Sequence, residues 1–536
     1  MKVVSLGMVS CVIFEDEHLL AVNKPAGWNT HAPSPYAGEG IYDWLKHREP
    51  RWAALAIIHR LDKETSGVMV FGKTALANRS LTEQFAQRRV RKTYALLTDR
   101  DVPAKEFTAR STLARAGDKY ASRPGGEPAE TRFVPLAAGS RRGAFKMVRA
   151  LPLTGRTHQI RVQAAEHGFP ILGDTLYGGT AAARVCLHAT EIVLAHPATN
   201  APLGLSAPVD FEADARLALR RAMLEPEATN AFRLIHGAGD GWTGWQVDKL
   251  GNYLLSQSEA GLTDRQQAEL FRLAEVFASR GAYHKVLTRH VRRSSKPEAS
   301  PQLVLGQAAS GPVEILENGV RYELSFTEGY SFGLFLDQRD NRRRLLTGHV
   351  AAGFPLPEVL SPAAEMLNVF AYTCGFSVCA ARAGARATSL DLSKKYLEWG
   401  RRNFRLNGLD PSAADFIYGE AFGWLGRLAR KHRAFEVVVL DPPTFSQSRE
   451  HGTFRVEKDF QELVAAALRL LKPGGVLLAC ANANDWLAPK FIMSVESAVR
   501  EASRRIVNQH YVPQPPDFPV SHAEQAYLKT LWLRVG

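Results

Sequence analysis

Residues 367–378 read LNVFAYTCGFSV, an apolar run that leads through a short turn into small residues. This pattern predicts a buried strand followed directly by a helix. The alternation returns in TSLDLS (388–393) and in FEVVVLDPP (435–443), with helical patterns between the strands. Regular exchange of strands and helices is typical of a doubly wound α/β sheet, so we predict a Rossmann-like fold for the C-terminal part of the chain.

Acidic and rigid residues follow two of these predicted strands. Doubly wound sheets bind ligands at the carboxyl ends of their strands, where the backbone amides of a helix start can also meet a ligand. Asp391 falls where such sheets place a carboxylate on a ribose, although it could also cap the next helix. Asp441, Pro442 and Pro443 follow the apolar strand, with a structural turn as the alternative interpretation.

The N-terminal 210 residues carry a different pattern. Two short strands, VIFED (12–16) and LLAVN (19–23), predict a β-hairpin. Residues 145–153 and 158–168 predict a strand followed by a helix, whereas residues 81–97 predict an amphipathic helix that runs into a strand near Thr93. Four basic side chains at that junction either contact a polyanion or form a solvated helix end: Arg88, Arg89, Arg91 and Lys92.

Two loops of this region concentrate ionisable groups. The first, HRLDKETSG (59–67), is either a functional loop or an Asx-type turn in which Asp62 caps the next segment. The second, LTGRTHQIR (153–161), lies far away in sequence, but one of its arginines could orient a buried carboxylate by a bidentate contact. We expect His158 to be a satisfied histidine at a helix start rather than a proton-transfer group.

These loops resemble the two defining motifs of RluA-type pseudouridine synthases, namely HRLDKETSG and TGRTHQIRVQAAEHGFPILGDTLYGG (154–179). The segments NKPAGW (23–28), RKTYAL (91–96) and LHA (187–189) resemble further parts of that family, and the likeness covers residues 12 to about 210. It implies that Asp62 is the catalytic nucleophile, that Tyr94 stacks on an extruded base and that Arg161 pairs with Asp62.

The implied chemistry agrees with these residue types. Isomerising uridine requires a carboxylate near the C1′ atom, but neither a redox cofactor nor a metal. A base in a stem must be everted before it can be reached, for which an aromatic face and a basic loop are suitable. The residues expected to contact RNA are His59, Arg60, Arg88, Arg89, Arg91, Lys92, Arg156 and His158.

The C-terminal part resembles class I S-adenosylmethionine-dependent methyltransferases of large-subunit ribosomal RNA (RlmK/RlmI-like). The likeness covers residues 230–536 and lies in LNVFAYTCGFSV, DLSKKYLEWGRRNFRLNGL (391–409), VVVLDPPTFSQS (437–448) and LLKPGGVLLA (470–479). It implies S-adenosylmethionine as the methyl donor, with Asp441, Pro442 and Pro443 facing the target base. The residues implied to line the donor's entry or to hold it are Phe335, Asp337, Arg339, Asn368, Phe370, Tyr372, Thr373, Gly375, Asp391, Glu420 and Asp441.

Two residues depart from this family pattern, and both could weaken donor binding. Cys374 stands where glycine is usual, and Glu420 stands where aspartate is common. The target atom is a separate question, because cytosine C5 methylation needs a cysteine that attacks C6 whereas guanine N7 needs only positioning. Cys480 is either that catalytic nucleophile or an inert buried cysteine. The motifs resemble the guanine-N7 subgroup more closely, so we expect N7.

Composition agrees with an intracellular RNA-binding protein. Lys and Arg number 67 against 54 Asp and Glu, a formal charge of +13 that favours polyanion partners. The five cysteines show neither zinc-site nor disulfide spacing, so we expect no metal and a reducing, cytoplasmic location. No signal peptide or membrane span is expected, and hence no membrane partner.

We expect a multidomain α/β and α+β protein. Its parts would be a synthase domain at 1–210 with a mixed, largely antiparallel sheet, a linker at 211–229, a small central α+β domain at 230–345 and a Rossmann-like methyltransferase domain at 346–536. The stretch after Glu191 already resembles a linker. Four arginines either contact phosphates or form a solvated helix face: Arg339, Arg342, Arg343 and Arg344.

The leading interpretation is an enzyme with both activities, because each half carries its own chemical residues. The alternative keeps the synthase active and makes the C-terminal half an RNA-binding platform that has lost its methyl donor.

Overall fold

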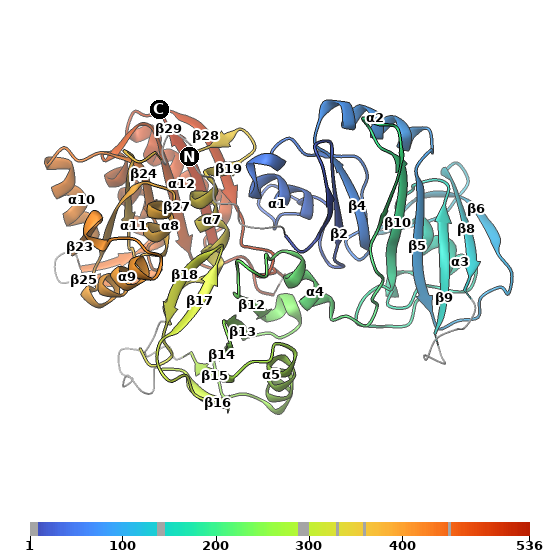
Figure 1. Cartoon of the computed structure of the whole chain (residues 1–536), viewed down its shortest axis with the longest axis horizontal. Helices are drawn as coiled ribbons and strands as arrows, with labels where there is room; N and C mark the ends of the chain where they lie inside the picture. Colours follow the sequence, from blue (N-terminus) through green and yellow to red (C-terminus); the bar gives the residue numbers. More distant parts are fainter. Residues whose placement is uncertain are drawn as a thin grey trace.

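The computed structural model of the chain describes residues 9–136, 145–287, 300–328, 332–356, 361–448, 452–521 and 523–536. Two large sheets lie at opposite ends of the molecule, and a smaller sheet lies below and between them (Figure 1). Among the described residues, no helix is long and apolar enough to cross a membrane. The predicted multidomain α/β and α+β architecture is confirmed.

The N-terminal sheet is mixed and largely antiparallel, as predicted. Its strands follow the order β1-β2-β4-β10-β5-β9-β8-β6-β7, with β3 beside β4 and β11 beside β10. The strands are β1 (Val12–Glu15), β2 (Leu19–Lys24), β3 (Ala56–Ile57), β4 (Ser66–Gly72), β5 (Arg91–Thr98), β6 (Phe107–Ala116), β7 (Lys119–Ser122), β8 (Glu127–Pro135), β9 (Lys146–Pro152), β10 (Leu187–Ala195) and β11 (Pro202–Ser206). Its helices are α1 (Ile41–Arg48), α2 (Ala75–Ala86) and α3 (Gln159–Glu166).

Most elements of this half match the sequence pattern, with two exceptions. The hairpin of β1 and β2 is confirmed, as is the strand β9 followed by helix α3. Helix α2 ends earlier than predicted, because Arg88 takes a left-handed backbone conformation (φ +56°) and β5 already starts at Arg91. The stretch after Glu191 is not a linker, since β10 continues to Ala195 and pairs with β11.

A central sheet joins the two ends of the molecule. Its strands are β12 (Ala231–His236), β13 (Trp245–Leu250), β14 (Tyr253–Ser258), β15 (Gly281–Val286) and β16 (Gln302–Gly306), accompanied by helices α4 (Ala215–Ala222) and α5 (Asp264–Val276). Leu254 belongs to an apolar cluster that includes residues of the N-terminal sheet, whereas Leu255 belongs to one that includes the C-terminal sheet. Because consecutive strand residues point to opposite faces, the central sheet shares one core with each half.

The C-terminal sheet is doubly wound, as predicted. Its order is β23-β22-β21-β24-β27-β29-β28, and β29 runs antiparallel to both of its neighbours. The strands are β21 (Glu365–Val369), β22 (Arg386–Asp391), β23 (Asp415–Tyr418), β24 (Phe435–Leu440), β27 (Leu471–Asn482), β28 (Ile506–Val512) and β29 (Leu528–Val535). The helices are α8 (Gly375–Arg382), α9 (Lys394–Leu406), α10 (Ala421–Arg430), α11 (Val456–Leu468) and α12 (Ala488–Glu501).

Within the described parts of the C-terminal half, three hairpins and helix α7 (Arg339–Thr347) lie beside this sheet and its helices. The hairpins are β17 (Val313–Glu317) with β18 (Val320–Leu324), β19 (His349–Ala351) with β20 (Phe354–Pro355), and β25 (Phe445–Ser448) with β26 (Gly452–Arg455). Helix α7 crosses the domain border expected at residue 345. The strands β17 and β18 pack into the same apolar cluster as the C-terminal sheet.

Helix α7 carries the four arginines, and both expectations for them are wrong. All four are buried, so they form neither a phosphate-binding surface nor a solvated helix face. Arg342 makes a bidentate contact with Glu317 at 2.6 and 2.8 Å, and Arg339 makes one with Asp517 at 2.9 and 2.7 Å. Each charge is therefore compensated inside the protein, which is how a buried guanidinium is tolerated.

Arg343 reaches across to the N-terminal half through a buried carboxylate. Arg48 of α1 donates to Glu225 at 2.6 Å, Arg343 lies 3.2 Å from the other oxygen of Glu225, and Arg343 also donates to Glu49. Burial alone would raise the pKa of Glu225, but Arg48 and Arg343 hold that pKa below its ordinary value. This cluster locks α1, the segment after α4 and α7 together.

Replacing Glu225 by glutamine should destabilise the chain by about 3 kcal/mol or more, because Arg48 and Arg343 would stay buried without a full counter-charge. The midpoint of thermal unfolding measures the loss. Glu227→Gln is the matched control, since Glu227 is exposed two residues further on, and it should change stability by less than about 0.5 kcal/mol. Equal effects of the two substitutions would contradict the role given to the cluster.

Candidate active sites

A cavity of about 880 Å³ in the N-terminal half brings together the two loops rich in ionisable groups. Residues 57–63 and 65 line one side, residues 152–161 line the other, and the junction of α2 with β5 closes a third. Asp62, Tyr94 and Arg161 all line this space. The functional interpretation of both loops is thus supported by their convergence, although they lie almost 100 residues apart in sequence.

Asp62 faces a buried arginine whose position is fixed by a different acid. Arg161 Nη1 lies 3.6 Å from Asp62 Oδ2, but the bidentate contact of this guanidinium goes to Asp174, at 2.7 and 2.9 Å. Asp174 is almost fully buried and needs both hydrogen bonds, whereas the Asp62 side chain is 26% exposed. Asp174 lies in the segment 154–179, but nothing in the local sequence pattern distinguishes it as the partner of Arg161.

His158 is oriented toward Asp62 by a tyrosine. Its Nδ1 lies 2.8 Å from the hydroxyl of Tyr177, and that hydroxyl accepts a hydrogen bond from the backbone amide of Tyr120. The other ring nitrogen, Nε2, lies 3.9 Å from Asp62 Oδ2, so the imidazole bridges Tyr177 and Asp62. Burial lowers the pKa of His158, although Asp62 opposes this effect.

Lys24 supports the loop that bears Asp62, a role that the sequence did not reveal. Its buried ammonium donates to the carbonyl oxygens of Pro25, Trp28 and Lys63 at 3.0, 2.7 and 3.2 Å. Burial lowers the pKa of Lys24 to about 7, while the negative charge of Asp62 opposes this effect. A lysine in a loop motif normally points to solvent, so only the fold identifies this internal tie.

The residues expected to contact RNA divide into two groups. Those that line the cavity are His59, Arg60, Arg88, Lys92, Arg156 and His158. Arg89 and Arg91 lie outside its lining, and Arg89 pairs with Glu83 on the exposed end of α2. His59 is neutral, because burial lowers its pKa to about 3. Its Nε2 accepts a hydrogen bond from the backbone amide of Val70, and its ring stacks on Phe85.

A second cavity, of about 810 Å³, opens at the carboxyl ends of β21, β22 and β24, where the doubly wound pattern places ligands. Seven of the residues expected to hold the donor line it: Phe335, Asp337, Phe370, Tyr372, Asp391, Glu420 and Asp441. Pro442 and Pro443 also line it. The lining includes parts of the β25–β26 hairpin and Asn482, which the sequence analysis did not single out.

Asp391 is held by backbone amides at the mouth of this cavity. Its two oxygens accept the amides of Tyr372 and Ser393, each at 2.8 Å. Burial raises the pKa of Asp391 to about 6. The alternative interpretation of Asp391 as the helix cap is wrong, because Ser393 caps α9 by accepting from the amide of Tyr396. Glu420 does cap a helix, since it accepts the amides of Phe422 and Gly423.

Two carboxylates meet at the inner end of the cavity. Burial and the nearby charge of Asp337 raise the pKa of Asp441 to about 7. Burial also raises the pKa of Asp337, whose Oδ2 accepts the hydroxyl of Tyr527 at 3.0 Å. Asp337 Oδ1 is buried and has no hydrogen-bond partner among the described residues. Such an oxygen is costly unless a ligand donates to it.

Five expected site residues do not line the cavity. Arg339 is committed to Asp517, and Cys480 lies inside β27 with its side chain fully buried, where burial raises the pKa of the thiol well above its ordinary value. That position contradicts an exposed nucleophile. The other three lie in or next to the loop at residues 370–374. Asn368 donates to Ser377, Thr373 donates to the carbonyl oxygen of Gly333, and Gly375 begins helix α8.

The loop at residues 370–374 contains no glycine. Phe370, Tyr372 and Cys374 have φ of +61°, +49° and +63°, the left-handed region that favours glycine. Strain of this kind persists only when packing enforces it. Gly400 of α9 leaves room for the Cys374 side chain, because a Cβ atom at position 400 would lie 2.3 Å from the Cys374 sulfur. The departure at Cys374 therefore keeps the left-handed conformation that glycine would adopt.

Comparison with known proteins matches residues 233–534 to the family of S-adenosylmethionine-dependent methyltransferases and residues 18–166 to the family of RNA pseudouridylate synthases. A ribosomal RNA large subunit methyltransferase of Deinococcus radiodurans is 32% identical over 334 residues, which are 60% of this chain and 78% of the relative. Ribosomal RNA large subunit methyltransferase I of Klebsiella pneumoniae is 31% identical over 322 residues, 59% of this chain and 76% of the relative.

The solved structure of human RNA pseudouridylate synthase domain containing 1 is 24% identical to the chain. It covers 42% of this chain and 94% of the human protein, with a TM-score of 0.31.

The packing of Cys374 on Gly400 predicts a strong coupling between these two positions. Gly400→Ala should destabilise the protein by about 1–3 kcal/mol, because the new methyl group overlaps the sulfur. In the Cys374→Gly background the same change should be neutral or stabilising, since alanine favours a helix by about 1 kcal/mol over glycine and the next contact, Thr373 O at 3.5 Å, is ordinary. Thermal unfolding of all four proteins measures the coupling, and additive effects would contradict it.

Proposed function

Because the chain belongs to the S-adenosylmethionine-dependent methyltransferases and carries an RNA pseudouridylate synthase domain, we propose that it modifies RNA at two separate active sites. The observation that carries the proposal is that each half holds its own cavity, lined by its own set of acidic and aromatic residues. We propose the division 1–210, 211–229, 230–345 and 346–536, in which helix α7 bridges the last two parts and the central sheet joins the catalytic halves.

In the N-terminal cavity, Asp62 is the proposed nucleophile toward an everted uridine. Its carboxylate attacks C1′ and the glycosidic bond to N1 breaks. The uracil then rejoins through C5 as the bond between Asp62 and C1′ breaks, with net transfer of the C5 proton to N1. Arg161 holds the carboxylate in place, and Tyr94 offers an aromatic face to the base from the same cavity. The cationic residues Arg60, Arg88, Lys92 and Arg156 contact the RNA backbone.

The C-terminal cavity fits S-adenosylmethionine, which supplies an electrophilic methyl group on its sulfonium when bound. Asp391 has acceptor capacity left for the ribose hydroxyls, and the partnerless Asp337 Oδ1 suits the ammonium of the methionine part. Glu420 lies beside the apolar Phe370 and Phe422 in the lining, an arrangement suited to adenine. Asp441, Pro442 and Pro443 hold the target base at the far side of the donor.

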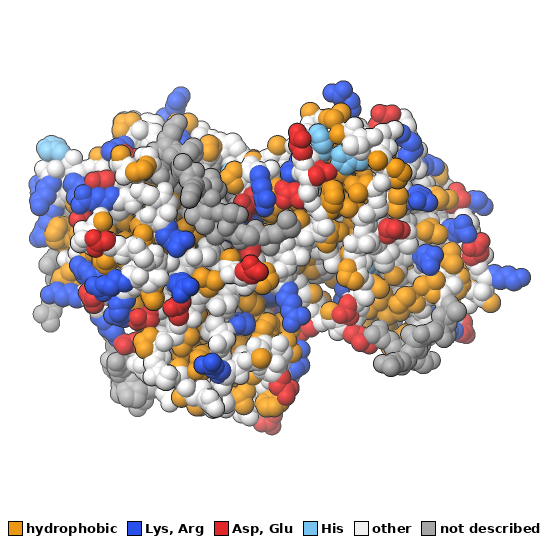
Figure 2. All heavy atoms as spheres, viewed as in Figure 1, with side chains coloured by type: hydrophobic (Ala, Val, Ile, Leu, Met, Phe, Trp, Pro, Cys, Tyr) orange, Lys and Arg blue, Asp and Glu red, His pale blue; other side chains and the backbone are white. Residues whose placement is uncertain are grey.

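Large-subunit ribosomal RNA is the proposed substrate of the methyltransferase. Both relatives described above are named for that RNA, and they match the region that holds the cavity. The net charge of +13 favours such a polyanion. On the face shown in Figure 2, Lys and Arg side chains are scattered over both halves rather than gathered in one patch. We place this activity in the cytoplasm.

Guanine N7 is the proposed target atom, rather than cytosine C5. Attack at cytosine C6 needs a cysteine in the cavity, and none of the described lining residues is a cysteine. Cys480 is buried inside β27, and the residue of this strand that lines the cavity is Asn482, two positions further on. An asparagine can hydrogen-bond a base but cannot form the covalent adduct. N7 is already nucleophilic and requires only positioning.

Asp62→Asn should abolish pseudouridine formation in RNA and leave methyl transfer unchanged, because the amide cannot attack C1′ while the second cavity is untouched. Mass spectrometry of nuclease-digested RNA measures both products. Glu64→Gln is the matched control: Glu64 also lies near Arg161, at 3.5 Å, but is not the nucleophile, so isomerisation should persist. Isomerisation by Asp62→Asn would refute the assignment.

Cys480→Ala should leave the methylation rate little changed, and the product should be 7-methylguanosine. Loss of a true nucleophile would instead cost several orders of magnitude. Cys379→Ala, a second fully buried cysteine, controls for the effect of a small cavity in the core. A large loss with Cys480→Ala alone, or a 5-methylcytidine product, would contradict the N7 proposal.

The alternative is an inactive C-terminal half that only binds RNA. Calorimetric titration with S-adenosylmethionine distinguishes the two, because the platform would show no donor binding. We expect binding that weakens in Asp391→Asn.

A further inference from the structure

Three potential metal ligands converge where the N-terminal half touches the C-terminal sheet. Glu39 precedes helix α1, His47 lies in the last turn of α1, and His510 lies in the edge strand β28. One ligand atom from each residue lies within 4.8 Å of the other two. The sequence cannot show this cluster, because its members stand at positions 39, 47 and 510.

The cluster contains one satisfied contact and one unsatisfied atom. His47 Nδ1 lies 2.6 Å from Glu39 Oε1, and the rings of His47 and His510 meet at 4.4 Å between centroids with an angle of 68°. His510 Nε2 is buried and has no hydrogen-bond partner among the described residues. A buried polar atom without a partner is unfavourable. The same imidazole offers a ligand atom beside those of Glu39 and His47, so the cluster suits an occupant.

We propose that Glu39, His47 and His510 bind a divalent transition-metal ion of the zinc type, which ties the two catalytic halves together. Two imidazoles and one carboxylate form a ligand set that zinc prefers, and water completes its coordination. The ion would lie between His47 Nδ1 and Glu39 Oε1 in place of their hydrogen bond, and the neutral imidazole of His47 would then carry its hydrogen on Nε2. His510 can serve as a ligand, because its buried Nε2 has no hydrogen-bond partner among the described residues.

The surrounding charges limit the affinity. Arg344 Nη2 lies 3.9 Å from the same Glu39 oxygen, while its other nitrogens donate to the carbonyl oxygens of Val350 and Asp340. A positive guanidinium opposes a second cation nearby. The site should therefore bind zinc more weakly than a structural site made of cysteine thiolates, which also bring negative charge.

Calorimetric titration of the full chain with zinc chloride tests the proposal. We expect one site, and we expect His47→Gln and His510→Gln each to weaken binding by more than the roughly 10–100-fold that loss of an outer-shell partner costs. His349→Gln is the matched control, because His349 lies in the same region but contacts the carbonyl oxygen of Lys46 at 3.2 Å. It should bind zinc as the unaltered chain does.

The tie between the halves gives a second measurement. Zinc should raise the midpoint of thermal unfolding of the unaltered chain and of His349→Gln, but not of His510→Gln, and a chelator should reverse the rise. Binding of S-adenosylmethionine by every variant confirms that each one is folded. The proposal is overturned if the unaltered chain binds no zinc, or if His47→Gln and His510→Gln bind it as well as the control.

Discussion

The carboxylate of Glu225, buried between Arg48 and Arg343, is the interaction on which the arrangement of the whole chain depends. A buried carboxylate needs a positively charged partner beside it, because an uncompensated charge in the interior costs several kcal/mol. Helix α1, the segment after α4 and helix α7 must therefore meet at one point. The central sheet adds an apolar constraint, since its two faces belong to the cores of different halves. The two catalytic units are thus packed against one another through the central sheet rather than joined only by a flexible linker.

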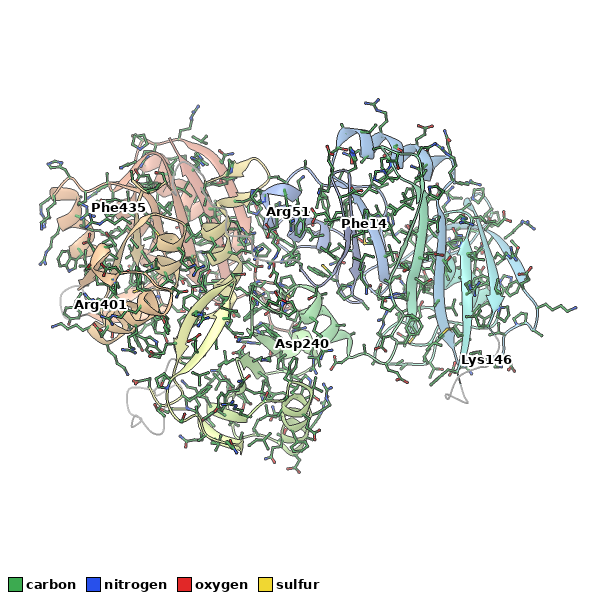
Figure 3. All side chains as sticks on the ribbon, in the orientation of Figure 1. Phe14, Arg51, Lys146, Asp240, Arg401 and Phe435 are labelled. Atoms are coloured by element: carbon green, nitrogen blue, oxygen red, sulfur yellow. The ribbon has the colours of Figure 1, made fainter. Side chains whose placement is uncertain are left out.

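Two charged residues near this joint are labelled in Figure 3. Arg51 is labelled beside α1, between the two large sheets, and Asp240 is labelled where α4 meets the central sheet. Asp240 accepts from Arg220 at 2.6 Å, and Arg220 also donates to the backbone of residue 517. Arg220 and Asp240 are therefore interior partners, whereas the Arg51 side chain is 48% exposed and pairs with Glu15.

The two cavities use burial in different ways. In the N-terminal cavity a buried guanidinium is fixed by Asp174 and faces the more exposed Asp62, so the proposed nucleophile is the carboxylate that remains accessible. In the C-terminal cavity burial raises the pKa of Asp391 and Asp441, and a cationic ligand would favour their ionised forms. The strained loop at Phe370, Tyr372 and Cys374 shows that close packing replaces glycine there.

The sequence alone determined the doubly wound sheet, the N-terminal hairpin and the residues of both site loops, because hydrophobic period and turn residues are local properties. It could not decide that Arg339 pairs with Asp517 or that Cys480 is buried inside a strand. Nor could it show that the ammonium of Lys24 binds the loop that carries Asp62. Those outcomes depend on which distant side chains become neighbours once the chain is packed. Whether a charged residue faces water or a buried counter-charge was decided by the tertiary structure, since burial and partners are properties of the fold and not of the local pattern.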